Sequence, residues 1–162
     1  MKELQILPEC YADTLLAEVL GFEKPNHKAN INEVAKTMKH TLKTSLAVGL
    51  IDDDKVTQEY FEEFSEYDRK YNTILKKHPD RKHYLIVLNP AFEKWVFNAA
   101  NISGIDPIKY GFRDIIAFKD ATKTIHARKN HNIKNFLNAI KQKLNNPITQ
   151  ITQWIEDILT KE

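Results

Sequence analysis

The chain has one cysteine, Cys10, which excludes an intrachain disulfide. No apolar run reaches the roughly 18 residues that a membrane-spanning helix needs. The formal net charge is only +2, so overall charge does not mark the protein as a nucleic-acid binder. We find no internal repeat, low-complexity tract or interdomain linker. These absences predict a single domain that needs neither a covalent cross-link nor a membrane.

The setting that the sequence predicts is cytoplasmic. Residues 1–4 enter strand-like sequence directly and show no signal-peptide pattern. A single cysteine agrees with a reducing compartment. With 162 residues, 42% of them hydrophobic and 28% charged, the chain has the composition of a soluble globular protein and enough length for a sizeable core.

Short apolar runs alternate with amphipathic segments along the chain, which predicts an α/β fold with a parallel-dominated sheet flanked by helices. Strands are expected at residues 4–7, 45–51 and 83–88. Helices are expected at residues 13–20, 31–42, 57–67, 91–100, 133–144 and 147–159. Residues 115–118 fit either a strand or a helical turn. We therefore expect one domain over 1–162, with a core at about 1–118 and a helical C-terminal extension at about 119–162.

Three consecutive carboxylates, Asp52, Asp53 and Asp54, end the apolar run 45–51. Such a run is typical of a buried parallel strand, and ligands of open α/β sheets bind at the carboxyl ends of strands. Crowded carboxylates repel one another, and a bound Mg²⁺ ion offsets that repulsion. In an extended chain Asp52 and Asp54 share one side, while Asp53 points away and serves at most as a supporting residue. The alternative is that these acids only cap the next helix.

Acids also follow the other two predicted strands. Glu9 comes directly after the first strand, and Asp13 lies one helical turn later. Glu93 follows the third strand. Because parallel strands end at the same edge of a sheet, we expect Glu9, Asp52 and Asp54 to converge within metal-binding distance.

These acids resemble a family motif. A strand that ends in Glu9, with an acid at Asp13, followed by a later strand that ends in Asp52-x-Asp54, resembles the Toprim domain of topoisomerases, primases, OLD-type nucleases and small repair nucleases. The segment 89–95, Asn-Pro-Ala-Phe-Glu-Lys-Trp, looks like the Asn-Pro-x-Phe-Glu-x-Trp element of RloB-like Toprim proteins, which are associated with restriction and phage-defence loci. The resemblance covers roughly residues 4–97. One position departs from it, because Cys10 stands where Toprim sequences usually have glycine.

The resemblance implies a Toprim-like fold and a nuclease or related phosphodiester-processing activity that depends on Mg²⁺ or Mn²⁺, in genome defence or DNA repair. Asp52 and Asp54 would anchor the metal. Glu9 would be a further metal ligand or the general acid/base. Glu93 would complete a two-metal arrangement or orient a ligand, and Asp13 would support the loop of Glu9 or cap its helix.

Cations gather in residues 119–143, which makes this segment the best candidate for contact with a nucleic-acid backbone, DNA or RNA. A solvated surface is the alternative. The individual candidates for phosphate contact are Lys55, His27, Lys28, Arg128 and Lys129.

Two other functions stay open. One is a non-catalytic Toprim-like binding or regulatory module that works with a partner ATPase or another defence protein. The other is an enzyme that acts on a small phosphorylated ligand, which would show a shallower salt dependence than a nucleic-acid binder. The apolar face of the last predicted helix packs on the core, with a homodimer contact as the alternative.

Overall fold

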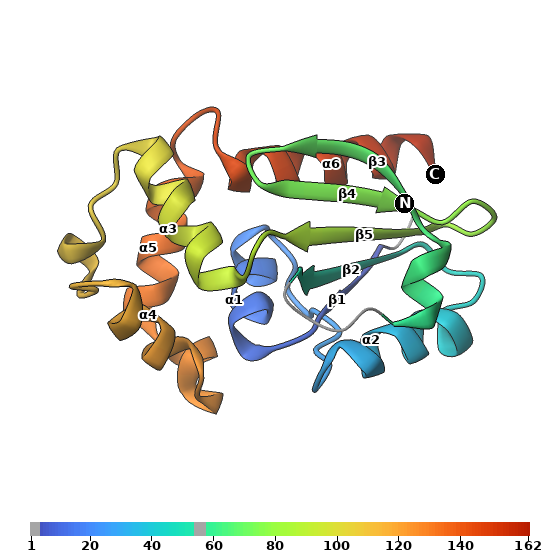
Figure 1. Cartoon of the computed structure of the whole chain (residues 1–162), viewed down its shortest axis with the longest axis horizontal. Coiled ribbons are helices and arrows are strands. Elements are labelled where there is room, and N and C mark those ends of the chain that lie inside the picture. Colours follow the sequence, from blue (N-terminus) through green and yellow to red (C-terminus); the bar gives the residue numbers. More distant parts are fainter. Residues whose placement is uncertain (1–3, 54–57) are drawn as a thin grey trace.

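The apolar runs form a five-stranded open sheet in the computed structural model, which describes residues 4–53 and 58–162 (Figure 1). The strands are β1 (Gln5–Pro8), β2 (Ala47–Asp52), β3 (Ser65–Lys70), β4 (Thr73–Lys77) and β5 (His83–Leu88), in the spatial order β1-β2-β5-β4-β3. β1, β2 and β5 are parallel, and β4 is antiparallel to both of its neighbours. The predicted α/β class is confirmed, with a mixed sheet.

The three predicted strands are the three parallel neighbours of this sheet, so their carboxyl ends share one edge. β2 is buried along nearly its whole length, as its continuous apolar run predicts. Gly49 in its middle permits close packing. A Cβ atom there would lie 2.8 Å from Leu85 Cδ2 and 3.2 Å from Val34 Cγ1. Gly49 therefore leaves room for the side chains of Leu85 and Val34 to pack over the middle of β2.

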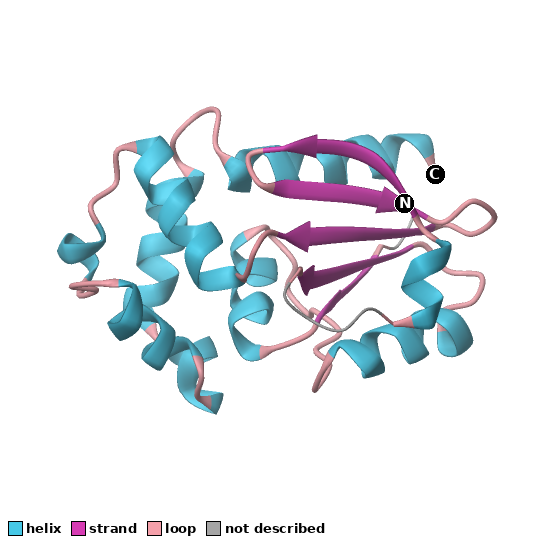
Figure 2. Ribbon diagram, in the orientation of Figure 1, coloured by secondary structure: helices cyan, strands magenta, loops and turns pink. Residues whose placement is uncertain are grey.

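Helices cover both faces of the sheet (Figure 2). One face carries α1 (Tyr11–Val19), α3 (Phe92–Ser103) and α6 (Pro147–Lys161), and α5 (His131–Lys141) packs against these helices. The other face carries α2 (Ile31–Lys36), its continuation η1 (Thr37–Thr41) and the short helix η2 (Glu59–Glu63).

Helix α4 (Ile115–Thr122) and the short helices η3 (Pro107–Tyr110) and η4 (Ile125–Lys129) complete the fold. Figure 1 shows α3, α4 and α5 gathered beyond the carboxyl ends of β2 and β5. This helical layer therefore faces the sheet edge that carries the acids. Residues 115–118, which fitted either a strand or a helical turn, form the start of helix α4.

The C-terminal helices belong to the same apolar core as the sheet. Ile148, Ile151 and Ile155 of α6 and Phe136 of α5 are buried in one cluster with strand residues. The predicted core packing of the last helix is confirmed. Within 4–53 and 58–162, no helix combines the length and the apolar character needed to cross a membrane.

The expectation of a helix over residues 57–67 is wrong. Within the described part of that range the chain forms only η2 and then enters β3, which pairs with β4 as a hairpin. The turn uses Tyr71 and Asn72, both with positive φ angles of 52° and 56°. β3 is polar and exposed along its whole length, so it has none of the alternation that predicts a strand.

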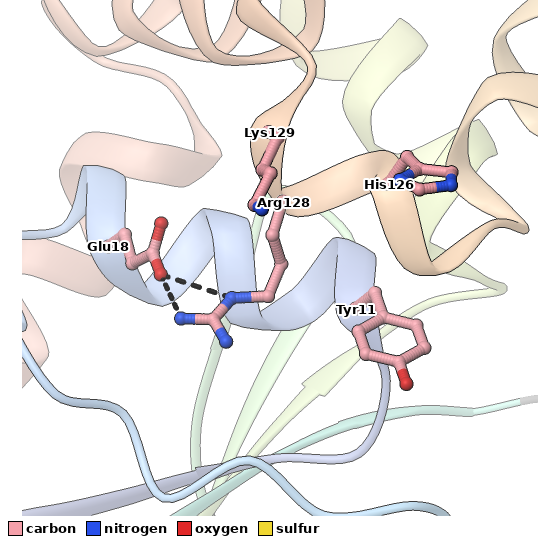
Figure 3. Close-up of a pocket in the computed structure, with 5 residues that line it drawn as sticks. All are labelled: Tyr11, Glu18, His126, Arg128 and Lys129. Atoms are coloured by element: carbon pink, nitrogen blue, oxygen red, sulfur yellow. Dashed lines mark hydrogen bonds and ion pairs between the residues drawn. The ribbon is translucent and has the colours of Figure 1, made fainter.

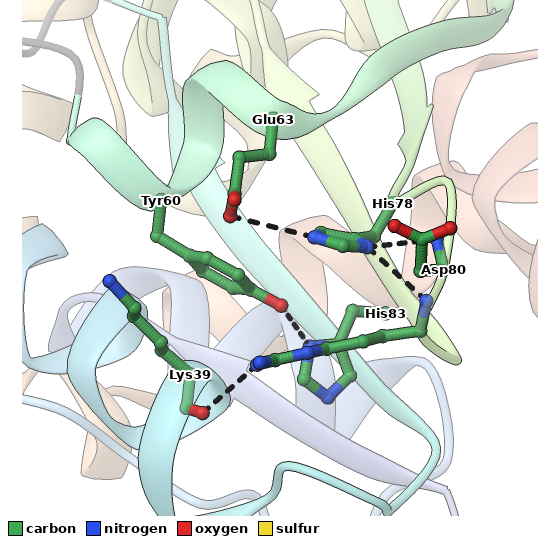
Figure 4. A network of polar contacts seen from close by, with 7 residues as sticks. Lys39, Tyr60, Glu63, His78, Asp80 and His83 are labelled. Carbon is green, nitrogen blue, oxygen red and sulfur yellow. Dashed lines mark hydrogen bonds and ion pairs between the residues drawn. The ribbon is translucent and has the colours of Figure 1, made fainter.

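A buried polar network lies at the amino-terminal end of β5, away from the acids (Figure 4). The Tyr60 hydroxyl donates to His83 Nδ1 at 2.5 Å, and His83 Nε2–H donates to the Leu42 carbonyl at 2.8 Å. His78 Nδ1 accepts backbone N–H groups of Asp80 and Arg81 at 3.1 and 3.2 Å. Both imidazoles are therefore held in a single neutral tautomer.

This network predicts a loss of stability in mild acid. Burial lowers the pKa of His83. As pH falls below about 6.5, His83 of the unfolded chain takes up a proton that the folded chain resists, so the free energy of unfolding decreases. Urea unfolding between about pH 7.5 and 5 measures the slope. His83→Gln should reduce it, and an identical slope in both proteins would contradict this role.

Candidate metal centre

The acidic edge begins where β1 passes into α1. The Glu9 backbone N–H donates to the Leu50 carbonyl at 3.3 Å, which holds Glu9 beside the end of β2. Cys10 is the N-cap of α1, and its sulfur accepts the Asp13 backbone N–H at 3.4 Å. This cap starts the helix so that Asp13, in its first turn, lies inside the protein.

Three carboxylates converge at this edge. Oxygen atoms of Glu9, Asp13 and Asp52 all lie within 4.8 Å of one another. Asp13 is fully buried, Glu9 is 4% exposed, and Asp52 is half-buried with Oδ1 shielded from solvent. Neither carboxylate oxygen of Asp13 has a hydrogen-bond partner among the described residues. The convergence of Glu9 with Asp52 was predicted, whereas Asp13 was expected to play only a supporting part.

The charge of this cluster needs compensation. Burial, followed by the nearby charges of Asp52 and Glu9, raises the pKa of Asp13 well above its usual range. Three carboxylates this close resist simultaneous ionisation unless a cation or a proton joins them. The donor set consists of carboxylate oxygens, which suits hard divalent cations such as Mg²⁺ and Mn²⁺. The residues present therefore fit a metal ion, whose identity the geometry leaves open.

A cavity of about 370 Å³ opens in front of the acids. Glu9, Asp52 and Glu93 line it, and the wall contributed by α4 and its C-cap brings Lys119 and Lys123. Acids and cations thus share one cavity, which suits an anionic group that bridges a metal ion and the lysine side chains. The two lysines belong to the predicted basic segment, and their spacing of four residues is the sequence signal that would have singled them out.

Glu93 lies in this cavity without joining the three-carboxylate cluster found among the described residues. Its Oε1 lies 3.1 Å from the Thr122 hydroxyl, which shares its single hydrogen between Glu93 and the Lys119 carbonyl at 2.9 Å. This contact links the start of α3 to the end of α4. Phe92 and Trp95, on either side of it in sequence, are buried in the core. The two aromatic side chains of segment 89–95 therefore pack in the apolar core, whereas Glu93 lines the cavity.

Cys10 also lines this cavity, beside Glu9. Burial and the nearby Asp13 raise the pKa of the Cys10 thiol, so it stays protonated at neutral pH. A protonated thiol is a poor nucleophile, and its contact with the α1 backbone gives it a structural part.

Asp53 and Asp54, the other two acids after β2, do not belong to the cluster found among the described residues. Asp53 is exposed, and its backbone N–H donates to the Leu88 carbonyl at 3.0 Å. Asp54 and Lys55 lie outside the described residues, so their predicted parts in metal and phosphate binding stay predictions.

Four of the predicted phosphate-contact residues are described: His27 and Lys28 in the loop between α1 and α2, and Arg128 and Lys129 on η4. His27 Nδ1 lies 2.7 Å from Thr14 Oγ1, and burial, followed by the charge of Arg128, lowers the pKa of His27. Lys28 adds a smaller effect in the same direction. Arg128 and Lys129 of η4 line a separate cavity over α1 (Figure 3). Arg128 and Lys28 therefore lie near His27, and Arg128 and Lys129 share one cavity.

Comparison with known proteins gives no relative, because no family model, curated protein or solved structure matches the chain significantly. Function must therefore be inferred from residue geometry: buried carboxylates, a cavity and the cations that face them.

Proposed function

We propose that this protein is a divalent-metal-dependent nuclease with a Toprim-like site that cleaves phosphodiester bonds of nucleic acid, in genome defence or DNA repair. The observation that carries the proposal is the buried cluster of Glu9, Asp13 and Asp52 at the carboxyl edge of parallel strands. The order of these acids along the chain, and the Asn-Pro-x-Phe-Glu-x-Trp segment on the neighbouring strand end, also support it.

Each side chain has a part in this proposal. Glu9, Asp13 and Asp52 would hold the ion, which would supply neutralisation of phosphate charge. Lys119 and Lys123 contact non-bridging phosphate oxygens from the other wall of the cavity.

Glu93 has one oxygen engaged by Thr122, so its other oxygen is placed to accept a hydrogen bond from water in the cavity. This gives Glu93 a part in orienting water. Bringing a phosphodiester, a water molecule and these groups together is the usual source of rate enhancement in such sites.

Cys10 motivates a second candidate, a non-catalytic module that works with a partner protein such as an ATPase. Its side chain takes up space beside Glu9 that glycine would leave open. The backbone at Cys10 is extended, with φ of −147° and ψ of 177°, which any residue adopts. The fold therefore accepts cysteine here, and the choice between the candidates rests on catalytic turnover.

Titration calorimetry with Mg²⁺ and Mn²⁺ tests the metal site. Asp52→Ala should weaken binding about a hundredfold or more, because loss of a ligand costs at least as much as loss of the groups that orient ligands. Asp53→Ala is the matched control, since it removes the same charge from the adjacent exposed position. Equal effects of the two substitutions, or no binding by folded wild-type protein, would count against the site.

Cleavage assays on single- and double-stranded DNA and RNA test the activity itself. The wild-type chain and Asp53→Ala should cleave with Mg²⁺ or Mn²⁺, and Asp52→Ala should not. Metal binding without cleavage of any of these substrates would favour the non-catalytic module. Turnover of a mononucleotide alone, insensitive to salt, would favour an enzyme of small phosphorylated ligands.

A further inference from the structure

A second cavity adjoins the acidic one and differs from it in charge. It encloses about 560 Å³ and is lined by Tyr11, Glu18, His126, Arg128 and Lys129 (Figure 3). Tyr11 lines both cavities, so the two adjoin at this residue. A volume of this size falls within the range of ordinary small-ligand sites. A ligand that spans Tyr11 would reach from the acids into the second cavity.

The second cavity favours an anion. Arg128 donates through Nε and Nη2 to Glu18 Oε1, at 3.2 and 2.5 Å, and its third nitrogen points away from Glu18 in Figure 3. Lys129 has no ion-pair partner among the described residues. Pairing with Glu18 therefore fixes the guanidinium and leaves N–H donors for another acceptor, while Lys129 adds a positive charge.

The aromatic wall of this cavity is held rigidly. The Tyr11 ring stacks on His27 with ring centroids 4.7 Å apart and an interplanar angle of 16°. The Thr14 hydroxyl donates to the Cys10 carbonyl at 2.7 Å, so His27 Nδ1–H donates to Thr14 Oγ1. A ring fixed in this way is a preorganised surface on which a nucleobase can stack.

A third cavity adjoins the acidic one at Glu93 and Lys119. It encloses about 350 Å³ and is lined by Lys94 among others. The acidic cavity therefore adjoins one lysine-bearing cavity at Tyr11 and another at Glu93 and Lys119. A mononucleotide would need only one of these, whereas a strand that passes over the acids would use both.

We propose that the cavity between Tyr11 and Lys129 binds the nucleotide next to the phosphodiester at the acids, with its base on Tyr11 and its phosphate on Arg128 and Lys129. The strand continues into the cavity of Lys94, so the site takes an internal segment of single-stranded nucleic acid. This inference rests on the proposed function only in placing the neighbouring phosphodiester at the acidic cluster.

Fluorescence anisotropy with a labelled single-stranded oligonucleotide in EDTA tests the cavity without the metal. Lys129→Ala should weaken binding about five- to tenfold at 0.1 M salt and reduce the slope of log K against log salt by about one. Tyr11→Ala should weaken it roughly fivefold or more, and Tyr11→Phe should restore stacking. Lys36→Ala is the matched control, because it removes one exposed lysine from α2 on the other face of the sheet.

Three outcomes would overturn the inference: an equal loss in Lys36→Ala, no loss in Tyr11→Ala, or competition by AMP or polyglutamate as effective as that of unlabelled oligonucleotide. The oligonucleotide-binding experiment can fail or succeed independently of the metal-binding experiment. A wild-type chain that binds the oligonucleotide through Tyr11 and Lys129 but binds no Mg²⁺ would contradict the nuclease and support the nucleotide cavity.

Discussion

Asp13→Asn is expected to stabilise the metal-free protein by about 1–3 kcal/mol at neutral pH. The Asp13 carboxylate is fully buried, and an oxygen of each of Asp52 and Glu9 lies within 4.8 Å. Two like charges at that separation repel by about 3.5 kcal/mol at an effective dielectric constant of 20. Asparagine keeps the shape and removes the charge. Urea unfolding in EDTA at pH 7 measures the gain.

The pH dependence of this gain has a definite sign. Because the pKa of Asp13 is raised in the folded state, its contribution to stability is fully present below the ordinary carboxyl pKa of about 4 and is lost as pH rises through the folded value. The advantage of Asp13→Asn should therefore vanish near pH 4 and be largest at neutral pH. Asp53→Asn, at the exposed neighbour of Asp52, should change stability little at either pH.

Added metal should reverse the ranking. A ligand present at a thousand times its Kd stabilises the folded state by about 4.1 kcal/mol, which exceeds the expected advantage of Asp13→Asn, and the wild-type protein should gain this from Mg²⁺ or Mn²⁺. Asp13→Asn should gain much less, because it lacks one of the three clustered carboxylates. A variant that is less stable than wild type in EDTA would instead show that the Asp13 carboxylate stabilises the fold without metal.

The acidic edge could be predicted because its signals are local. β2 and β5 are continuous apolar runs, and the residues just after a buried parallel strand lie at the carboxyl edge of the sheet. The direction of Asp13 was harder to predict. It depends on where Cys10 starts α1, and cysteine is an uncommon helix cap.

The cationic walls depend on long-range packing, which is why the sequence indicated a basic segment without its location. α4 reaches the cavity because Phe118 is buried against Phe92 and Phe112, at centroid distances of 6.0 and 4.9 Å. Arg128 pairs with Glu18, which is 110 positions away in sequence. No periodicity within the basic segment encodes either contact. The β3–β4 hairpin was missed for a different reason, since its exposed outer strand has no apolar pattern.

Trp95→Ala is expected to cost about 3–5 kcal/mol of unfolding free energy, because it empties the space of a large, fully buried side chain. Trp95 lies in the first turns of α3 with no exposed surface, and its Nε1–H donates to Thr73 Oγ1 at 2.8 Å. Thr73 opens β4 and is also fully buried. The indole therefore ties α3 to the sheet by both packing and a hydrogen bond. Urea unfolding measures the loss.

Trp95→Phe separates these two contributions. It keeps most of the packing but leaves the Thr73 hydroxyl without its donor, which should cost about 1–3 kcal/mol. The Thr73 hydroxyl also donates to the Tyr71 carbonyl at 3.1 Å. Trp95→Phe and Thr73→Val should therefore cost less together than the sum of their separate losses, because both remove the same Trp95–Thr73 hydrogen bond. Two independent, additive losses in this pair would contradict the hydrogen bond as the link between α3 and β4.

Trp95 is also expected to affect activity, because it lies close to Glu93 at the start of α3, and Glu93 lines the acidic cavity. Trp154 offers a matched comparison: it is buried on α6, and its Nε1–H donates to Asp68 Oδ2 at 3.0 Å on the far strand β3. Trp154→Phe should lower stability without affecting cleavage by the folded protein. Trp95→Phe should lower cleavage as well, since it loosens the helix that positions Glu93. Equal cleavage by the two folded variants would show that α3 holds Glu93 without the Trp95 anchor.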